Sequence, residues 1–228
     1  RSAASVADLA SLVPAARIQT NSRGETMVYL RNAGERQTAV LFDGALLNVP
    51  WDYRVDMSLV PAGMVGGVSV AKGVPPVEYG TNVLGGAVNL TSRLFERSAQ
   101  PVTELEVSYG SETQLRGILS HRGSNGPVAY AASLGYSSTN GAPLPNGAVL
   151  PFSQPNPAVR TNSDTRITNG FGRAIYHFNN GTEIGVSVLH LDAEKGVAPE
   201  GHKDAAVSAV RFWRYPVWRN SQVIVSGE

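Results

Sequence analysis

Residues 128–137 read VAYAASLGYS, and this stretch decides the class of fold. Larger apolar side chains recur at every second position, while the positions between them carry only small or hydroxyl side chains. Successive side chains of a β-strand point to opposite faces, so the stretch predicts a strand with one apolar face. This pattern is typical of transmembrane β-barrels, in which lipid-facing residues alternate with lumen-facing ones. The apolar face comprises Val128, Tyr130, Ala132, Leu134 and Tyr136.

The same alternation occurs elsewhere after about residue 102. In residues 103–109 the apolar or aromatic positions alternate with two glutamates and a serine, and residues 183–188 repeat the pattern. Counting alternating segments between turns predicts roughly six antiparallel strands in residues 102–228. Aromatic residues near the strand ends match the interfacial girdles of membrane barrels. They are Tyr109, Tyr136, Tyr176 and Phe178.

The predicted connections alternate in length. Residues 123–127 and 179–181 are short turns, and Asn180-Gly181 is a strong hairpin signal. Residues 138–164 and 193–216 are long, polar and rich in Pro and Gly. Outer-membrane barrels have short periplasmic turns and longer extracellular loops, so we expect the long connections to lie outside the cell. A soluble antiparallel sheet with one wet face is the alternative, because a single barrel segment gives a weak signal.

Residues 1–94 have a different character. A short amphipathic helix is predicted at Val6–Leu12 and ends at Pro14. Short apolar strands separated by glycine-rich loops favour a small mixed sheet. The predicted strands are Met27–Leu30, Thr38–Phe42, Val65–Ala71 and Val88–Leu90. The expected fold class is an α+β domain at residues 1–94, a linker at 95–101, and antiparallel strands of an incomplete transmembrane β-barrel at 102–228.

Composition excludes several classes of function. The 19 basic and 18 acidic residues give a net charge of +1, so nothing favours nucleic acid as a partner. The chain has no cysteine, which removes disulfides, thiolate metal sites and cysteine nucleophiles. No apolar run reaches the roughly 18 residues of a spanning helix. The histidines lack metal-ligand spacing, and no nucleophile motif or carboxylate pair stands out. We therefore expect no metal site, no cofactor and no catalytic residue.

A series of motifs runs through residues 5–93 in a fixed order. It opens with the helix and Val13-Pro14, and continues through short strands, tight turns and a glycine pair. The later motifs are Tyr29-Leu30-Arg31-Asn32, Val40 to Asn48, Asp56 to Pro61, Lys72 to Gly80 and Gly85 to Leu90. Together they resemble the plug domain of TonB-dependent outer-membrane receptors. Asn32, Lys72 and Gly66-Gly67 depart from the pattern, because the family has glycine, arginine and a charged pair there.

The resemblance implies active transport rather than catalysis. Receptors of this family take up a scarce solute, most often a ferric siderophore or similar metal chelate, with TonB as the driving partner. It also implies the outer membrane of a Gram-negative bacterium and contact with its lipid. Family barrels close with about 22 strands, so we expect this sequence to be part of a longer receptor. The segment that binds TonB is expected to lie outside this sequence.

The resemblance also points to site residues. Arg31 and Arg93 match plug arginines that, in the family, pair with barrel glutamates and hold the plug in place. Loops 32–37 and 49–54 should form the floor of a substrate pocket, where guanidinium, indole and phenol groups could bind an anionic metal chelate. The candidate ligand-binding residues are Arg36, Gln37, Trp51, Tyr53 and Arg54. The alternative roles are surface charge for the arginines and packing beneath a loop for Trp51.

Two other functions stay open at this point. An outer-membrane enzyme or adhesin would have similar strands but no reason for the plug motifs. A soluble β-rich binding module would fold without detergent, so detergent dependence of the intact protein separates it from a membrane receptor.

Overall fold

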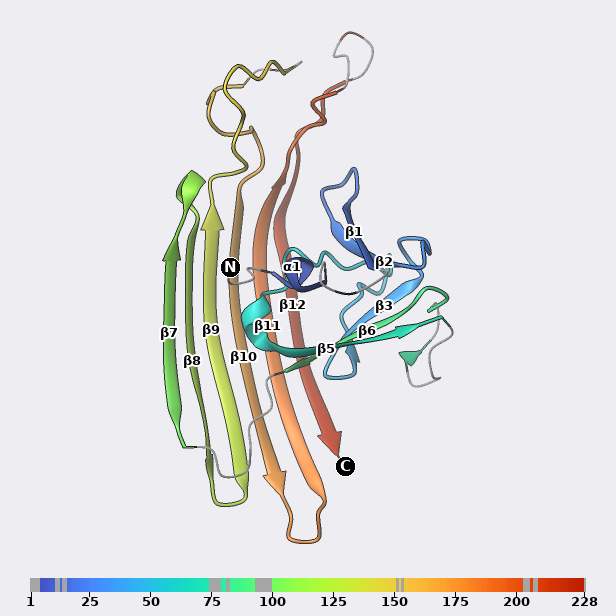
Figure 1. Ribbon diagram of the computed structural model, residues 1–228, viewed down its shortest axis with the longest axis vertical. Helices are drawn as coiled ribbons and strands as arrows, with labels where there is room; N and C mark the ends of the chain where they lie inside the picture. Colours follow the sequence, from blue (N-terminus) through green and yellow to red (C-terminus); the bar gives the residue numbers. More distant parts are fainter. Residues whose placement is uncertain are drawn as a thin grey trace.

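The computed structural model describes residues 5–10, 13, 16–73, 79–80, 83–92, 100–150, 152, 154–202, 206 and 209–227. Within these residues the chain forms a tall sheet, here called the wall, and a smaller N-terminal region (residues 5–92) that packs against one face of it (Figure 1). No helix in the described part of the chain is long and apolar enough to cross a membrane.

The wall is an antiparallel meander in which each strand pairs with its neighbours in sequence, and β7 and β12 lie at its two edges (Figure 1). In the described residues its strands are β7 Val102–Tyr109, β8 Leu115–Asn125, β9 Val128–Thr139, β10 Thr165–His177, β11 Glu183–Val197 and β12 Trp213–Gly227. The predicted antiparallel strands after residue 102 are therefore confirmed. As described, the sheet is open, since β7 does not pair with β12.

Side chains of the wall alternate between two environments, as the sequence pattern predicted. Along β9, Ser133 is 8% exposed on the face toward the N-terminal region, whereas Leu134 is 65% exposed on the opposite face. The small inner side chains allow the N-terminal region to approach the strand closely. The opposite face is rich in exposed apolar side chains, among them Leu105, Val107, Val186, Val188, Val223 and Val225.

The two ends of the wall differ in the length of their connections (Figure 1). At one end, β8 joins β9 through Gly126 and Pro127, and β10 joins β11 through a tight turn completed by Gly181 with φ +88°. At the other end lie the long connections at residues 140–164 and 198–212. The predicted alternation of short and long connections is thus present.

The connection predicted at residues 193–216 is shorter in the structure, because β11 continues to Val197 and β12 begins at Trp213. The polar, Pro- and Gly-rich composition of residues 193–216 favoured a loop throughout, and the prediction is wrong for the two ends of this segment. Polar side chains near the end of β11 are accommodated in the strand because they are paired. Asp192 bonds to Arg219 on the outer face, and Lys195 pairs with a carboxylate of the N-terminal region.

Strand β12 contains a bulge close to this point. Ala193 pairs with Trp218, whereas Lys195, two residues later, pairs with Tyr215, so β12 has one extra residue here. Pro216 lies within the bulge, where a residue without a backbone N–H interrupts no regular ladder.

The N-terminal region is a small mixed sheet with a hairpin beside it. Its described elements are α1 Val6–Ala10, β1 Ala16–Thr20, β2 Thr26–Leu30, β3 Thr38–Phe42, β4 Ala45–Leu46, η1 Ala62–Met64, β5 Val65–Lys72 and β6 Gly86–Ser92. In the sheet, ordered β4-β3-β6-β5, β3 and β6 run parallel and the other pairs are antiparallel. This confirms the α+β class. Strand β1 was not predicted, because ARIQT has Ile18 as its single large apolar residue. Pro14 lies outside the described residues.

The glycine pair of the motif has a steric cause. Gly86 adopts φ +126°, a region that other residues rarely enter, and a Cβ at this position would collide with the carbonyl oxygen of Ala71. The pairing of β5 with β6 therefore requires glycine here.

The two parts of the chain share a hydrophobic core. Phe42 and Leu30 are fully buried in the same cluster as Phe171 of β10 and Leu189 of β11. The rings of Phe42 and Phe171 meet edge to face, with centroids 5.6 Å apart. The wall thus supplies part of the core of a region too small to bury enough surface alone. The linker expected at residues 95–101 falls mostly outside the described residues, so the domain boundaries stay a prediction.

Candidate functional site

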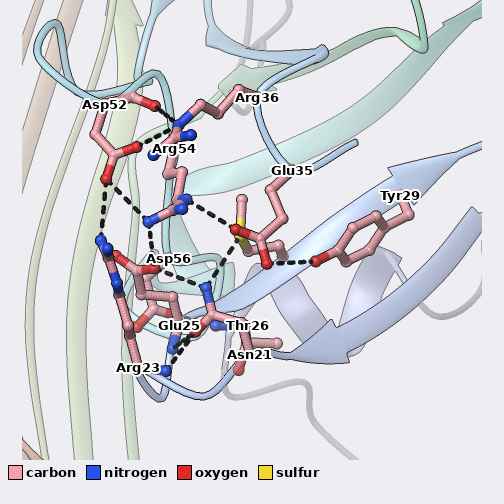
Figure 2. Close-up of polar contacts among 11 residues, drawn as sticks. Asn21, Arg23, Glu25, Thr26, Tyr29, Glu35, Arg36, Asp52, Arg54 and Asp56 are labelled. Carbon is pink, nitrogen blue, oxygen red and sulfur yellow. Dashed lines mark hydrogen bonds and ion pairs between the residues drawn. The ribbon is translucent and has the colours of Figure 1, made fainter. Parts of the chain in front are cut away.

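Loops of the N-terminal region converge at the end that faces the long connections of the wall. These apical loops are residues 21–25 between β1 and β2, 31–37 between β2 and β3, and 47–56 after β4. Lys195, near the end of β11, donates a hydrogen bond to the carbonyl oxygen of Gly24 and fixes this orientation. Polar side chains from all of these loops meet in one cluster, as Figure 2 shows.

Arg54 lies at the centre of the apical loops, with a side chain only 10% exposed. Its Nη1 is 2.9 Å from Asp52 Oδ2 and 3.6 Å from Glu25 Oε2, and its Nε is 2.9 Å from Glu35 Oε2 (Figure 2). A buried guanidinium requires carboxylates around it, and its planar shape allows contact with several at once. Arg54 therefore joins the apical loops, and its charge is compensated inside the protein.

Asp52 connects this buried arginine to arginines at the surface. Its carboxylate accepts a hydrogen bond from Arg36 Nε at 2.7 Å and lies 3.3 Å from Arg23 Nη1. Burial raises the pKa of Asp52, but the hydrogen bond from Arg36 and the charges of Arg54 and Arg23 outweigh it and lower the pKa overall. Arg36 is 58% exposed, so much of its side chain faces solvent.

The lowered pKa of Asp52 predicts that the apical loops loosen in acid. A carboxyl whose pKa is lowered by folding stabilises the native state above its unfolded pKa, and this contribution is lost as the pH falls through the folded value. The ordinary pKa of an aspartate side chain is 3.8. We therefore expect slow hydrogen exchange at residues 47–56 near about pH 6 and faster exchange near about pH 3, after correction for intrinsic rates. Asp52→Asn should exchange quickly at both values. Unchanged protection of the wild type in acid would contradict the prediction.

The structure places the candidate ligand-binding residues in different environments. Trp51 is 82% exposed, and Arg36 also reaches the surface. Gln37 Oε1 accepts a hydrogen bond at 2.7 Å from a backbone amide of its own loop, which shapes that loop. Tyr53 adopts φ +56° and is half-buried, and burial raises the pKa of its phenol. Ligand contact stays a prediction for these residues and for the enclosed Arg54.

Asn48 is a structural residue of the site that the sequence reading missed. Its buried side chain accepts a hydrogen bond from Val40 N at 2.7 Å and donates to the carbonyl oxygens of Thr38 and Tyr53 at 3.1 and 2.9 Å. It thereby fastens the loop that carries Trp51 to strand β3. The available signal was an amide residue immediately after the short return strand.

Ion pairs between the N-terminal region and the wall were also missed. Arg173 of β10 lies 2.8 Å from Asp43 Oδ2 and donates to Ser92 Oγ at 2.7 Å. Lys195 of β11 lies 2.7 Å from Asp56 Oδ2. In both contacts the wall carries the cation. The available signal was strand phase, since each basic residue shares the inward face of its strand with buried apolar residues.

The two arginines predicted to hold the N-terminal region and the wall together are not among these ion pairs. Arg31 is exposed after the end of β2 with φ +52°, and its guanidinium lies beside Gly73. Within the described part of the chain it forms no ion pair. Arg93 lies outside the described residues. A lock through either residue stays a prediction.

Cavities lie between the apical loops and the long connections. One of about 170 Å³ is enclosed by the turn at residues 21–25 and the start of β12, and its charged and aromatic lining comprises Arg23, Glu200, Arg211 and Trp213. Another of about 500 Å³ lies in the seam between the β1–β2 hairpin and strands β10 and β11. Its hydroxyl lining comprises Thr20, Ser22, Thr26, Ser58, Ser163 and Thr165. Among the described residues, no group of His, Cys, Asp or Glu could hold a metal ion.

Comparison with known proteins agrees with this architecture. Residues 1–87 match the family model of the TonB-dependent Receptor Plug Domain. No curated protein matches the chain.

Solved structures with a similar fold include three metal-uptake proteins. The FrpB iron transporter from Neisseria meningitidis is 14% identical, with a TM-score of 0.73 over 99% of this chain and 36% of that one. A copper transporter, OprC, is 16% identical, with a TM-score of 0.70 over 87% of this chain and 29% of that one. The ferric yersiniabactin uptake receptor FyuA from Yersinia pestis is 14% identical, with a TM-score of 0.64 over 86% and 30%. The chain thus spans about a third of the length of these proteins.

The fold, a compact domain lying against one face of an antiparallel sheet, is similar to part of the fold of these transporters. Residues 1–87 match the plug domain of TonB-dependent receptors, and the fold of nearly the whole chain matches part of such a structure, so the resemblance seen in the sequence is confirmed. The N-terminal region is called the plug from here on.

Proposed function

We propose that the protein acts in the outer membrane of a Gram-negative bacterium as part of a receptor for a scarce solute, a ferric siderophore or similar metal chelate, and that TonB drives the uptake. One observation carries the proposal. Arg36 and Trp51 are exposed on the apical loops, while Arg54 neutralises the carboxylates buried beneath them. The similar structures include an iron transporter, a copper transporter and a receptor for ferric yersiniabactin, which supports the same class of solute.

The chemistry of the apical loops suits an anionic chelate. Arg36 and Arg23 share Asp52 as a partner at their exposed ends. A ligand carboxylate or catecholate can replace Asp52 as the acceptor for these guanidinium groups without exposing a buried charge, because Arg54 keeps Glu25 and Glu35. Trp51 supplies a flat apolar surface for the organic part of the chelate.

Contact with membrane lipid is part of the same proposal. The wall turns its small and polar side chains toward the plug and its apolar side chains, such as Leu105 and Val223, away from it. A band of this kind is stable against hydrocarbon, where each apolar side chain avoids water.

Binding of chelates of different charge tests the proposal. The probes are a trianionic ferric tris-catecholate and an uncharged ferric trihydroxamate, added to the receptor purified from outer membranes in detergent. We expect Arg36→Gln to weaken binding of the trianion about tenfold, the effect of one charge-assisted hydrogen bond. The same change should affect the uncharged chelate less, whereas Trp51→Ala should weaken both.

The matched control is Arg122→Gln, which removes a partly exposed arginine of β8 close to the short turn between β8 and β9, at the opposite end of the wall from the long connections. It should leave both affinities unchanged. Failure of the receptor to bind either chelate, or equal loss in all three variants, would contradict the proposed site.

A further inference from the structure

Lys195 occupies a position where the wall touches two separate parts of the plug. Its Nζ donates to Asp56 Oδ2 at 2.7 Å, to Ser58 Oγ at 2.9 Å and to the carbonyl oxygen of Gly24. Asp56 is almost fully buried, and its other oxygen accepts a hydrogen bond from Thr26 N at 3.0 Å. One wall side chain therefore fixes both the apical turn at residues 21–25 and the segment that follows Arg54.

The end of β11 is also where the two long connections are fastened. Gly196 N donates to Asp164 O at 2.9 Å, directly beside Lys195. Asn162 Nδ2 donates to the carbonyl oxygens of Val197 and Trp213, at 2.9 and 2.6 Å. A single amide thus ties connection 140–164 to both ends of connection 198–212.

Other contacts join the two long connections to each other. Arg214 forms two hydrogen bonds with the carboxylate of Asp164, and Arg160 donates to the carbonyl oxygen of Pro199. Phe152 meets Phe212 edge to face, with ring centroids 5.8 Å apart. A displacement of either connection is therefore transmitted to the end of β11, where Lys195 begins its contacts with the plug.

We propose that Lys195 is a coupling residue that transmits the position of the two long connections to the plug. In the state described here its contacts hold the apical turn against β11, and displacement of the connections withdraws the ammonium group and releases the turn. This inference rests on the proposed function in one respect: it takes the long connections to lie on the side of the protein from which the chelate arrives.

The surroundings of Lys195 allow such a release. The cavity of about 500 Å³ beside it is lined by hydroxyl groups, so water can satisfy Asp56 and Gly24 O when the ammonium group leaves. The Arg173–Asp43 pair differs in this respect. Its arginine lies on β10, two residues from Phe171 of the shared core and away from the long connections. We assign it a static role.

A double-mutant cycle tests the coupling, because coupled residues show non-additive effects. The readout is hydrogen exchange at residues 19–30 and 56–60 in the receptor expressed from its full reading frame, in detergent and without a chelate. Asn162→Gly removes the amide but keeps the φ of +54°, which glycine tolerates. We expect Lys195→Met to accelerate exchange about tenfold, the effect of losing a hydrogen bond to a charged group, and Asn162→Gly to accelerate it about fivefold, because its hydrogen bonds are neutral.

The double variant should exchange no faster than Lys195→Met alone, because the connections then have no route to the plug. The control pair is Asn162→Gly with Arg173→Met, whose effects should simply add. If Lys195→Met does not fold, Ser58→Ala replaces it in the cycle and should give a smaller, partly non-additive effect, because Lys195 keeps Asp56 and Gly24 as partners. Additive effects of Asn162 and Lys195, or no effect of Asn162→Gly on the plug, would overturn the coupling. Since no chelate is used, neither outcome depends on the proposed ligand.

Discussion

Arg54→Met is expected to destabilise the plug by about 3 to 5 kcal/mol, the loss typical of removing one partner from a buried charge cluster. The substitution leaves Glu25, Glu35 and Asp52 close together without the guanidinium that separates and neutralises them. The measurement is the denaturant midpoint of plug unfolding, followed by hydrogen exchange so that the stability of the barrel does not mask it.

Arg36→Met is the matched control for this substitution. Arg36 contacts the same Asp52 but is mostly exposed, so its loss should lower stability by less than about 1 kcal/mol. The two variants separate structural from ligand-binding roles, because Arg54 holds the loops together and Arg36 is the proposed contact to the solute. A stable plug in Arg54→Met combined with lost chelate binding would reverse this assignment and support Arg54 as a ligand contact.

Arg173→Met is expected to loosen the plug from the wall while leaving the barrel folded. The substitution leaves the buried carboxylate of Asp43 without its arginine partner and removes the hydrogen bond to Ser92. We expect the attachment of the plug to weaken by about 3 kcal/mol or more. The plug should become sensitive to protease, whereas the barrel should keep its heat-modifiable mobility on a gel, because its hydrogen-bond ladder does not depend on this side chain. Wild-type protease resistance in Arg173→Met would contradict the contact.

Arg31→Ala is the comparison for that experiment. The family resemblance predicts that Arg31 pairs with a barrel carboxylate, and such a partner would have to lie beyond the described residues. If that lock exists, Arg31→Ala will also sensitise the plug and its effect will add to that of Arg173→Met. An exposed Arg31 without a partner is worth less than about 1 kcal/mol and will change nothing.

The sequence predicted the wall because several of its strands, at residues 103–109, 128–137 and 183–188, carry a local signal. The alternation through Ser133 and Leu134 is local, and it requires no knowledge of what the inner face touches. The mixed sheet of the plug was likewise predicted from short apolar runs such as Thr38–Phe42. By contrast, β1 has too few apolar residues to be recognised, and it is a strand because Ala16 and Ile18 pack on a core supplied by other elements.

The site was less predictable than the fold because its charges find partners far along the chain. Arg54 was predicted as a ligand contact, yet Glu25 and Glu35 lie in earlier loops that only the fold brings to it. Lys195 was assigned to a loop, since nothing near it in sequence reveals Asp56, which lies 139 positions away. Pairings of this kind follow from topology, which local composition does not contain.

The shared core around Phe42 and Phe171 has a consequence for biogenesis. Translation completes residues 1–87 before β10 and β11 exist, so the part of the shared core that Phe171 and Leu189 supply is still missing when the plug is first made. We therefore expect the nascent plug to leave part of its apolar core uncovered at first. It reaches its native packing only when the wall strands assemble beside it. The plug then depends on the wall for its final packing, whereas the hydrogen-bond ladder of the wall does not depend on the plug, so a defect in β10 or β11 will appear first as a misfolded plug.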